Sequence, residues 1–137
     1  MFQEITIIGN LGKDPVSKVG ASGKSYSTFS VGVNRKDANG QKETAWFYVS
    51  TFEKTGQYVM NYAKSGSLVM VKGRLQFDAQ NGGPRIWTDA SGSPRASFEI
   101  IADKVQILAG YKNSDDDQAA APTARQAQRY QDHPEYY

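Results

Sequence analysis

The stretch YSTFSVGVN (residues 26–34) alternates apolar and polar side chains with a period of two residues. This period is typical of a β-strand that turns one face toward a core. Phe29, Val31 and Val33 share the apolar face, and the opposite face carries smaller or more polar side chains apart from Tyr26. We therefore predict a strand here, with its apolar face buried.

A second alternating stretch, TAWFYVSTF (residues 44–52), follows after a short polar segment. The segment contains DANG (residues 37–40), and an Asn-Gly pair supplies the positive φ angles of a tight turn. The two stretches therefore predict a β-hairpin. In its second strand Phe47, Val49 and Thr51 face inward, and the outward side chains are Trp46, Tyr48, Ser50 and Phe52.

Further strands are predicted by alternating runs at residues 5–11, 67–77 and 96–108. Helical spacing of the apolar residues predicts one short helix within residues 53–65, and a Gly- and Pro-rich stretch fills residues 78–95. Three strands, a helix and two more strands is the order of the OB-fold. The predicted class is therefore all-β with one short helix, a five-stranded Greek-key barrel of the kind that binds oligonucleotides.

The composition changes after Leu108, where apolar periodicity ends and Gln, Ala, Asp and Pro become frequent. Residues 1–108 carry a net charge of +4, whereas residues 109–137 carry −2. The second part has too little apolar surface to offset the entropy of ordering it. We therefore expect a folded domain over residues 1–110 and a disordered tail over residues 111–137.

Signals for catalysis are missing from the sequence. The chain has no cysteine, its one histidine is His133 in the predicted tail, and no acidic pair has metal-site or acid–base spacing. No apolar run approaches the ~20 residues that span a bilayer. We therefore expect a cytoplasmic binding protein that is not an enzyme, with no catalytic residues, no metal, no cofactor and no membrane partner.

Large aromatic side chains are predicted on the outer face of the second hairpin strand, where Trp46, Tyr48 and Phe52 share one side. Trp87 lies in the Gly- and Pro-rich stretch, two residues after Arg85. One base stacked on an aromatic ring contributes ~1–3 kcal/mol whatever the base. We interpret the four rings as candidate stacking sites, with Trp87 on a hairpin that grips DNA. Packing of these rings against a partner subunit or the long loop is the alternative.

Basic side chains are interleaved with these aromatic positions. Lys and Arg neutralise phosphates and release counterions, which gives salt-sensitive affinity without sequence preference. Lys18, Lys24 and Arg95 belong to this basic set. The candidate phosphate contacts are Lys13, Arg35, Lys36, Lys72, Arg74 and Arg85.

Five short motifs occur in a familiar order and spacing: IGNLGKDP (8–15), FSV (29–31), TAW (44–46), GSLV (66–69) and GRL (73–75). Together they resemble the bacterial-type single-stranded DNA-binding protein family, over about residues 1–108. The resemblance implies a homotetramer of OB-folds with DNA wrapped around it, serving replication, recombination and repair. By position, Trp46, Phe52 and Trp87 match the stacking aromatics of the family.

Three features depart from the pattern of that family. Asn34 stands ahead of Arg35 where family members often carry an aromatic residue, and Lys72 stands where an acid is usual. The family tail usually ends in an acidic run closed by Pro-Phe, which recruits replication and repair proteins. Here the acids begin the tail at residues 115–117 and the chain ends in DHPEYY (132–137). Recruitment of such proteins by this tail is therefore an open question.

Residues 1–110 are accordingly expected to form an OB-fold domain that binds and protects single-stranded DNA without sequence preference. The sequence leaves open whether the chain is encoded by a bacterium, a phage or a plasmid. An RNA-binding protein of the cold-shock kind is the alternative, although its tighter aromatic motif on adjacent strands is not found here. A third possibility is an assembly module whose aromatic rings are buried against protein.

Overall fold

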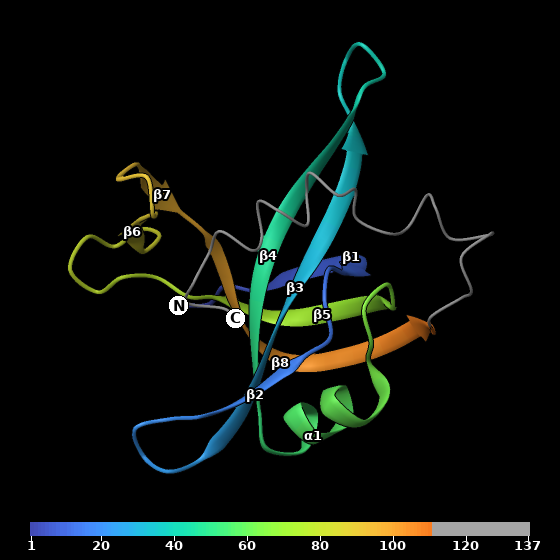
Figure 1. The fold of residues 1–137 in the computed structure, drawn as a ribbon, viewed down its shortest axis with the longest axis vertical. Helices are drawn as coiled ribbons and strands as arrows, with labels where there is room; N and C mark the ends of the chain where they lie inside the picture. Colours follow the sequence, from blue (N-terminus) through green and yellow to red (C-terminus); the bar gives the residue numbers. More distant parts are fainter. Residues whose placement is uncertain (111–137) are drawn as a thin grey trace.

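The computed structural model describes residues 1–110 (Figure 1). The five predicted strands correspond to β1, β3, β4, β5 and β8, and the predicted helix is α1. The predicted tail lies outside the described residues. In chain order the elements are β1 (Ile5–Leu11), β2 (Val16–Val19), β3 (Ser25–Lys36), β4 (Lys42–Phe52), α1 (Glu53–Tyr62), β5 (Leu68–Leu75), β6 (Ile86–Thr88), β7 (Pro94–Ala96) and β8 (Phe98–Ala109).

Five strands close into a barrel because β1 pairs with two neighbours. Most of β1 pairs antiparallel with β5, while Asn10 and Leu11 pair with Gly32 and Val31 of β3. The strand order is β1-β5-β8-β4-β3, with β2 added along β3, and only the β4–β8 pairing is parallel. This closed barrel with one helix between its third and fourth strands confirms the predicted OB-fold.

Two glycines permit the close strand approaches that closure of the barrel needs. A Cβ atom at Gly9 would overlap the carbonyl oxygen of Gly32, where β1 passes from β5 to β3. A Cβ atom at Gly73 would overlap the carbonyl oxygen of Ile101, beside a register shift between β5 and β8. Both positions therefore require glycine for space rather than for an unusual φ angle.

The barrel interior is filled by aliphatic side chains from every strand of the closed sheet. Phe29 and Val31 of β3 and Val49 of β4 are buried, as the alternation predicted, whereas Val33 and Phe47 are only partly buried. Each fully buried aliphatic side chain contributes about 1.5–3 kcal/mol relative to an exposed one. The most deeply buried aliphatic side chains are Leu11, Val31, Val49, Val59, Val69, Val71 and Ile100.

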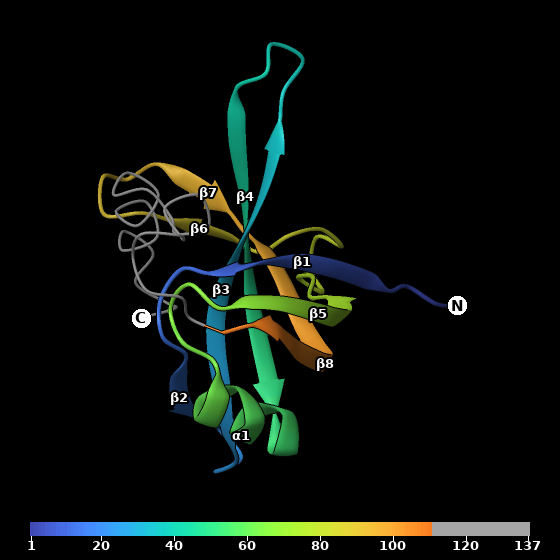
Figure 2. The ribbon, with the colours of Figure 1, turned by 90° about the vertical axis from the view of Figure 1, so that its right-hand side faces the viewer.

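Helix α1 lies at the end of the barrel opposite the tip of the β3–β4 hairpin (Figure 2). Val59 and Gly56 form its buried face, and Ser27 Oγ of β3 donates a hydrogen bond to the Gly56 carbonyl oxygen at 3.2 Å. The Tyr58 hydroxyl accepts a hydrogen bond from Ile107 N of β8 at 3.2 Å. The helix thus links β3 to β8 across the open end of the barrel.

The β3–β4 hairpin extends well beyond the barrel and ends at the predicted turn (Figure 1). Asp37 Oδ1 accepts hydrogen bonds from the backbone N–H groups of Asn39 and Gln41, each at 2.8 Å. Only Gly40 of the Asn39-Gly40 pair has a positive φ angle, so the two-residue turn that needs it at both positions is not formed. The longer loop is instead stabilised by the Asp37 carboxylate.

The bounds of three short strands were not predicted from the sequence, although a hairpin carrying Trp87 was. β2 adds to β3 with Val16 opposite Thr28, and the expected long loop folds back on itself as the β6–β7 hairpin. We call residues 76–97 the arm. Its two strands have three residues each, which is too short for an alternating pattern to stand out.

Candidate nucleic-acid interface

The outer face of β4 carries the predicted aromatic row, and the arm folds over part of it. Trp46 is half-buried, and Phe52 is 44% exposed. Tyr48 is only 8% exposed, so the prediction of an exposed ring at this position was wrong. Tyr48 points outward from the barrel core as the alternation requires, but residues of the arm and of β8 cover it.

A cleft of about 630 Å³ lies between β4 and the arm. We call it the indole cleft because Trp46 of β4 and Trp87 of β6 both line it. Tyr48 and Phe98 also contribute to its walls. Two indoles that are distant in the sequence therefore line one opening.

A second hollow, of about 470 Å³, lies further along β4 beside Phe52. We call it the Phe52 hollow, and it is lined by Tyr26, Tyr48, Phe52, Arg85 and Glu99, among others. The rings of Tyr26 and Phe52 are stacked, with centroids 5.6 Å apart and planes 26° apart. Tyr48 lines both openings, so the indole cleft and the Phe52 hollow adjoin along one strand.

Tyr26 was missed as a site residue by the sequence analysis. It lies directly opposite Phe52 in the β3–β4 register, which places the two rings on the same side of the hairpin. Its outward position was visible in the alternation of β3. The missing information was the register, because this decides which outward residue of β4 stands beside it.

Two glycines lie directly against the indole of Trp46. A Cβ atom at Gly12 would lie 2.9 Å from its ring, and one at Gly32 would lie 3.1 Å from it. Gly32 is also the residue directly opposite Trp46 in the β3–β4 pairing. The bare backbone at these positions lets the ring lie close to the barrel surface.

Tyr48 and Glu99 are neighbours in the parallel pairing of β4 with β8. Burial, and secondarily the negative charge of Glu99, raises the pKa of Tyr48 to about 12. The phenol therefore stays neutral across the physiological range.

The arm is held by three polar contacts that follow each other at intervals of two residues. Arg85 Nη2 lies 2.8 Å from Glu99 Oε1, and Trp87 Nε1 donates a hydrogen bond to Ser97 Oγ at 3.0 Å. The third contact joins Arg95 Nε to Asp89 Oδ2 at 2.8 Å. We call these three pairs the polar ladder.

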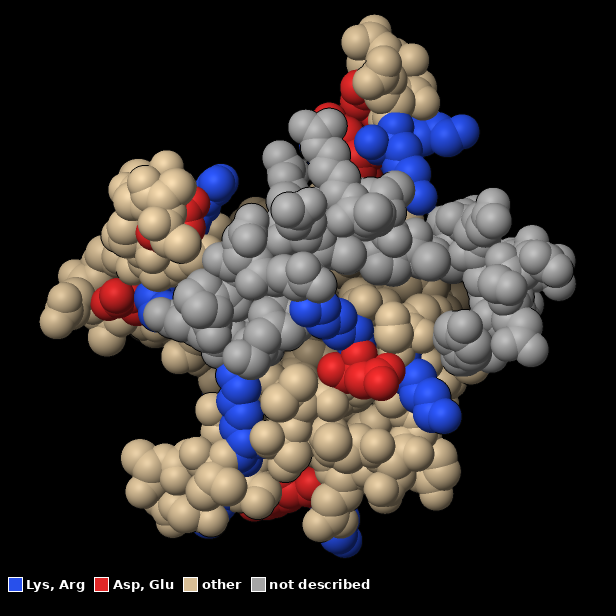
Figure 3. Space-filling view, in the orientation of Figure 1, with Lys and Arg blue, Asp and Glu red and all other residues tan. Residues whose placement is uncertain are grey.

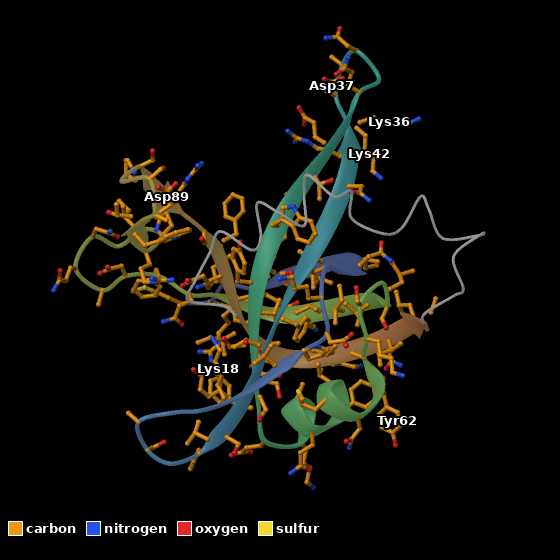
Figure 4. All side chains as sticks on the ribbon, viewed as in Figure 1. Lys18, Lys36, Asp37, Lys42, Tyr62 and Asp89 are labelled. Atoms are coloured by element: carbon orange, nitrogen blue, oxygen red, sulfur yellow. The ribbon has the colours of Figure 1, made fainter. Side chains whose placement is uncertain are left out.

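Asp89 also organises the turn at the end of the arm (Figure 4). Its Oδ1 atom accepts hydrogen bonds from the hydroxyl of Ser91 at 2.6 Å and from the N–H of Ser93 at 2.9 Å. Together with Arg95, these donors hold the pKa of Asp89 well below its ordinary value. The turn is thus built around a carboxylate that is ionised at neutral pH.

The predicted basic residues are spread over the molecule (Figure 3). Within residues 1–110, Arg85 is the one member of the predicted phosphate contacts that lines the indole cleft or the Phe52 hollow. Arg74 lies opposite Ile101, which lines the Phe52 hollow. Lys13 is half-buried after β1, whereas Lys72 lies on β5 between Thr6 and Lys104.

Several of these basic residues form ion pairs, Arg95 of the polar ladder among them. Arg85 pairs with Glu99, Arg35 Nε lies 2.8 Å from Glu43 Oε2, and Lys72 Nζ lies 3.4 Å from Glu4 Oε1. Their charges are therefore partly compensated before any ligand binds.

Two lysines face each other near the end of the β3–β4 hairpin. Lys36 and Lys42 are register partners, and both project from the hairpin below its tip (Figure 4). Like charges at directly opposite positions of a hairpin are destabilising. Lys42 was missed by the sequence analysis, although its position beside the turn opposite Lys36 could have been found from the hairpin register.

Two features are absent from the part of the chain that the structure describes. No group of three or more His, Cys, Asp or Glu side chains there could hold a metal ion. No helix in residues 1–110 has the length and apolar character needed to cross a membrane.

Comparison with known proteins agrees with this geometry. The model of the "Single-strand binding protein family" matches residues 2–108. "Single-stranded DNA-binding protein 1" of a Nostoc species is 31% identical over 112 residues, covering 81% of this chain and 87% of that protein. "Single-stranded DNA-binding protein 2" of Staphylococcus aureus is 33% identical over 116 residues, covering 83% and 78%.

The "Single-stranded DNA-binding protein" of Xylella fastidiosa is 32% identical over 113 residues. The match covers 80% of this chain and 65% of that protein, so the chain spans slightly less than two thirds of this relative. The family match over residues 2–108 spans the barrel and the arm, and together with these relatives it confirms the resemblance predicted from the five motifs. With the OB-fold in place and the family model matching nearly all of residues 1–110, the chain belongs to the single-strand binding protein family.

Proposed function

We propose that this chain binds single-stranded DNA without sequence preference and protects it during replication, recombination and repair. The observation that supports this most strongly is the indole cleft, in which Trp46 and Trp87 face one opening. The names of its relatives point to the same ligand. Binding alone accounts for this role, and no catalytic step is proposed.

Bases stack on aromatic rings along β4 in this proposal. Trp46 and Trp87 take one base between or against them, and Phe52 with its stacked partner Tyr26 takes another further along the strand. Tyr48 forms the floor between these two positions. Stacking needs only the flat face of a base, which explains binding without sequence preference.

Phosphates are contacted by basic residues around these openings. Lys36 and Lys42 lie opposite each other on the projecting hairpin, and we propose that they contact the phosphates of one strand. Arg74 lies beside the Phe52 hollow through its neighbour Ile101. The other proposed contacts are Lys13, Arg35 and Lys72, whereas Arg85 is already paired with Glu99.

We infer that the chain also associates with itself, as a homotetramer. Ile8 of β1 is 52% exposed and lies opposite Met70 of β5, so apolar side chains continue across two strands on the outside of the barrel. Phe47, which was predicted to face inward, is partly buried and stacks on Phe98 with centroids 5.3 Å apart. Light scattering tests this assembly, and a monomer at micromolar concentration would contradict it.

The proposal also includes a location in the cell and protein partners. We infer that the protein acts in the cytoplasm, where unpaired DNA arises in bacteria, whether the chain is encoded by a bacterium, a phage or a plasmid. The tail, residues 111–137, is proposed to contact replication and repair proteins. Deletion of this tail should leave DNA affinity in place and remove such contacts.

A competition experiment tests the central proposal. A labelled oligothymidylate bound to the protein is challenged with unlabelled single-stranded DNA, duplex DNA or RNA of matched length, at several salt concentrations. Single-stranded DNA should compete best, and log affinity should fall linearly with log salt, by ~0.7 per neutralised phosphate. Equal competition by duplex DNA, or affinity that does not respond to salt, would overturn the proposal. Preferred binding of RNA would instead favour the cold-shock alternative.

A further inference from the structure

An acidic side chain lies on the proposed path of a polyanion. Glu99 lines the Phe52 hollow beside Tyr48, and its side chain is 13% exposed. A carboxylate in this place repels phosphate and lowers affinity unless it has another role. Its partner is Arg85, which the sequence alone suggested as a phosphate contact.

The Arg85–Glu99 pair has the geometry of a fixed contact rather than a loose surface pair. Both Nε and Nη2 of Arg85 donate to Glu99 Oε1, at 3.3 and 2.8 Å. The arginine side chain is 32% exposed, so solvent screens this pair less than the exposed Arg35–Glu43 pair. The carbonyl oxygen of Glu99 also accepts a hydrogen bond from Gln76 N at 2.8 Å, which holds its backbone at the start of the arm.

Of the three pairs in the polar ladder, Arg85–Glu99 lies nearest the barrel, because Glu99 belongs to β8. Arg85 directly precedes β6, which contains Trp87, while Ser97 lies between β7 and β8 and Glu99 is the second residue of β8. The Arg85–Glu99 and Trp87–Ser97 contacts therefore join the same two chain segments only two residues apart, at the place where the arm meets the barrel. The orientation of Trp87 over the indole cleft is thus coupled to Glu99.

We propose that Glu99 is a positioning residue for single-stranded DNA binding: through Arg85 it fixes the arm so that Trp87 faces Trp46 before DNA arrives. Arg85 in this role acts on the arm and is not itself a phosphate ligand. A preformed cleft lowers the entropy cost of ordering the arm on binding. This inference rests on the proposed function, because it assigns residues to the same site.

The test compares Glu99→Gln, Arg85→Gln and the double variant in salt-dependent binding to an oligothymidylate. Each single variant should weaken binding by roughly three- to tenfold, and the double variant should be no weaker than the weaker single variant. The dependence of affinity on salt should stay unchanged, because no phosphate contact is lost. Arg85→Lys, which keeps the charge but loses the two-nitrogen contact, should also weaken binding.

A second readout needs no DNA. In a Trp46→Phe background the remaining indole is Trp87, and its quenching by acrylamide reports its exposure. Glu99→Gln should increase this quenching. Glu43→Gln, the same change in the exposed Arg35–Glu43 pair, is the matched control and should leave it unchanged. Thermal unfolding of each variant verifies that the barrel is intact.

Several outcomes would overturn the inference. Tighter binding by Glu99→Gln would show that the carboxylate only repels DNA. The slope of log affinity against log salt distinguishes the two roles of Arg85. If Arg85→Gln reduced this slope by the value of one phosphate contact and Glu99→Gln did not, Arg85 would bind phosphate directly. If the unmodified protein failed to bind the oligothymidylate, the proposed function would fall and this inference with it, whereas normal binding by both single variants would overturn the inference alone.

Discussion

The indole of Trp46 lies against the bare Cα of Gly32, its direct partner across the β3–β4 hairpin, so closely that a Cβ atom there would lie 3.1 Å from the ring. Gly12 approaches the same ring from the loop after β1, where a Cβ would lie 2.9 Å away. An aromatic side chain is thus seated on backbone from two separate segments. The position of the Trp46 ring therefore depends on glycine at positions 12 and 32, because a side chain at either one would crowd the ring.

Gly32→Ala should therefore move Trp46 without unfolding the barrel. The methyl group would meet the outer edge of the indole and a methyl of Thr44, both of which can shift by a few tenths of an ångström. We expect the free energy of binding single-stranded DNA to weaken by about 1 kcal/mol, which is the lower end of the contribution of one base stacked on an aromatic ring. Fluorescence titration measures it, and Gly20→Ala, whose Cβ would make ordinary contacts, is the control. Unchanged affinity in Gly32→Ala would show that the seating of Trp46 is irrelevant to binding.

Gly73→Ala should instead destabilise the fold. Its Cβ would overlap the backbone of Ile101, which cannot move without breaking the pairing of β5 with β8. We expect a loss of ~1–3 kcal/mol or more in the free energy of unfolding, measured by urea denaturation. Gly20→Ala should be close to neutral in the same measurement. Equal stability of the two variants would contradict the close strand approach.

The burial of Tyr48 makes the free energy of unfolding depend on pH in the alkaline range. Its folded-state pKa of about 12 lies above the value of ~10 in an unfolded chain, so folding favours the neutral phenol. This contribution is complete below pH ~10 and is lost as the pH rises toward the folded-state pKa. Urea denaturation should show a smaller loss of stability across this window in Tyr48→Phe than in the unmodified protein. Identical pH dependence in the two proteins would contradict the burial of this phenol beside Glu99.

The paired lysines of the β3–β4 hairpin should contribute to the salt dependence of binding. Replacement of Lys36 or Lys42 by alanine should reduce the slope of log affinity against log salt by ~0.7, the value for one phosphate contact on a single strand. Lys54→Ala, on α1 at the other end of the barrel, should leave the slope unchanged. A slope that responds equally to all three variants would indicate a general charge effect instead of a local contact.

Much of the fold could be predicted because the barrel strands alternate clearly. The sequences of β1, β3 and β4 alternate with period two, although in β3 both faces are buried from Ser27 to Gly32. β2 was not predictable in this way, since VSKV is four residues long and lies at the edge of the sheet. The β6 and β7 strands are shorter still, so the hairpin expected around Trp87 could not be given strand bounds.

The candidate site was predictable as a set of outward aromatics but not in its details. Alternation placed Tyr48 on the outer face correctly, yet its burial depends on how the arm folds over β4, which no local pattern contains. Arg85 appeared available for phosphate because Glu99 lies 14 residues away and becomes its partner only when the arm returns. Tyr26 needed the hairpin register to become a neighbour of Phe52. Long-range contacts thus decided what local periodicity could not.

The shared opening of Trp46 and Trp87 is tested most directly by fluorescence of two variants with a single tryptophan each, Trp87→Phe and Trp46→Phe. Each is titrated with an oligothymidylate. The account predicts that the remaining indole is quenched in both variants and that the two signals saturate at the same ratio of DNA to protein, because one bound strand contacts both rings. A tryptophan whose emission does not change when DNA is bound would contradict the account.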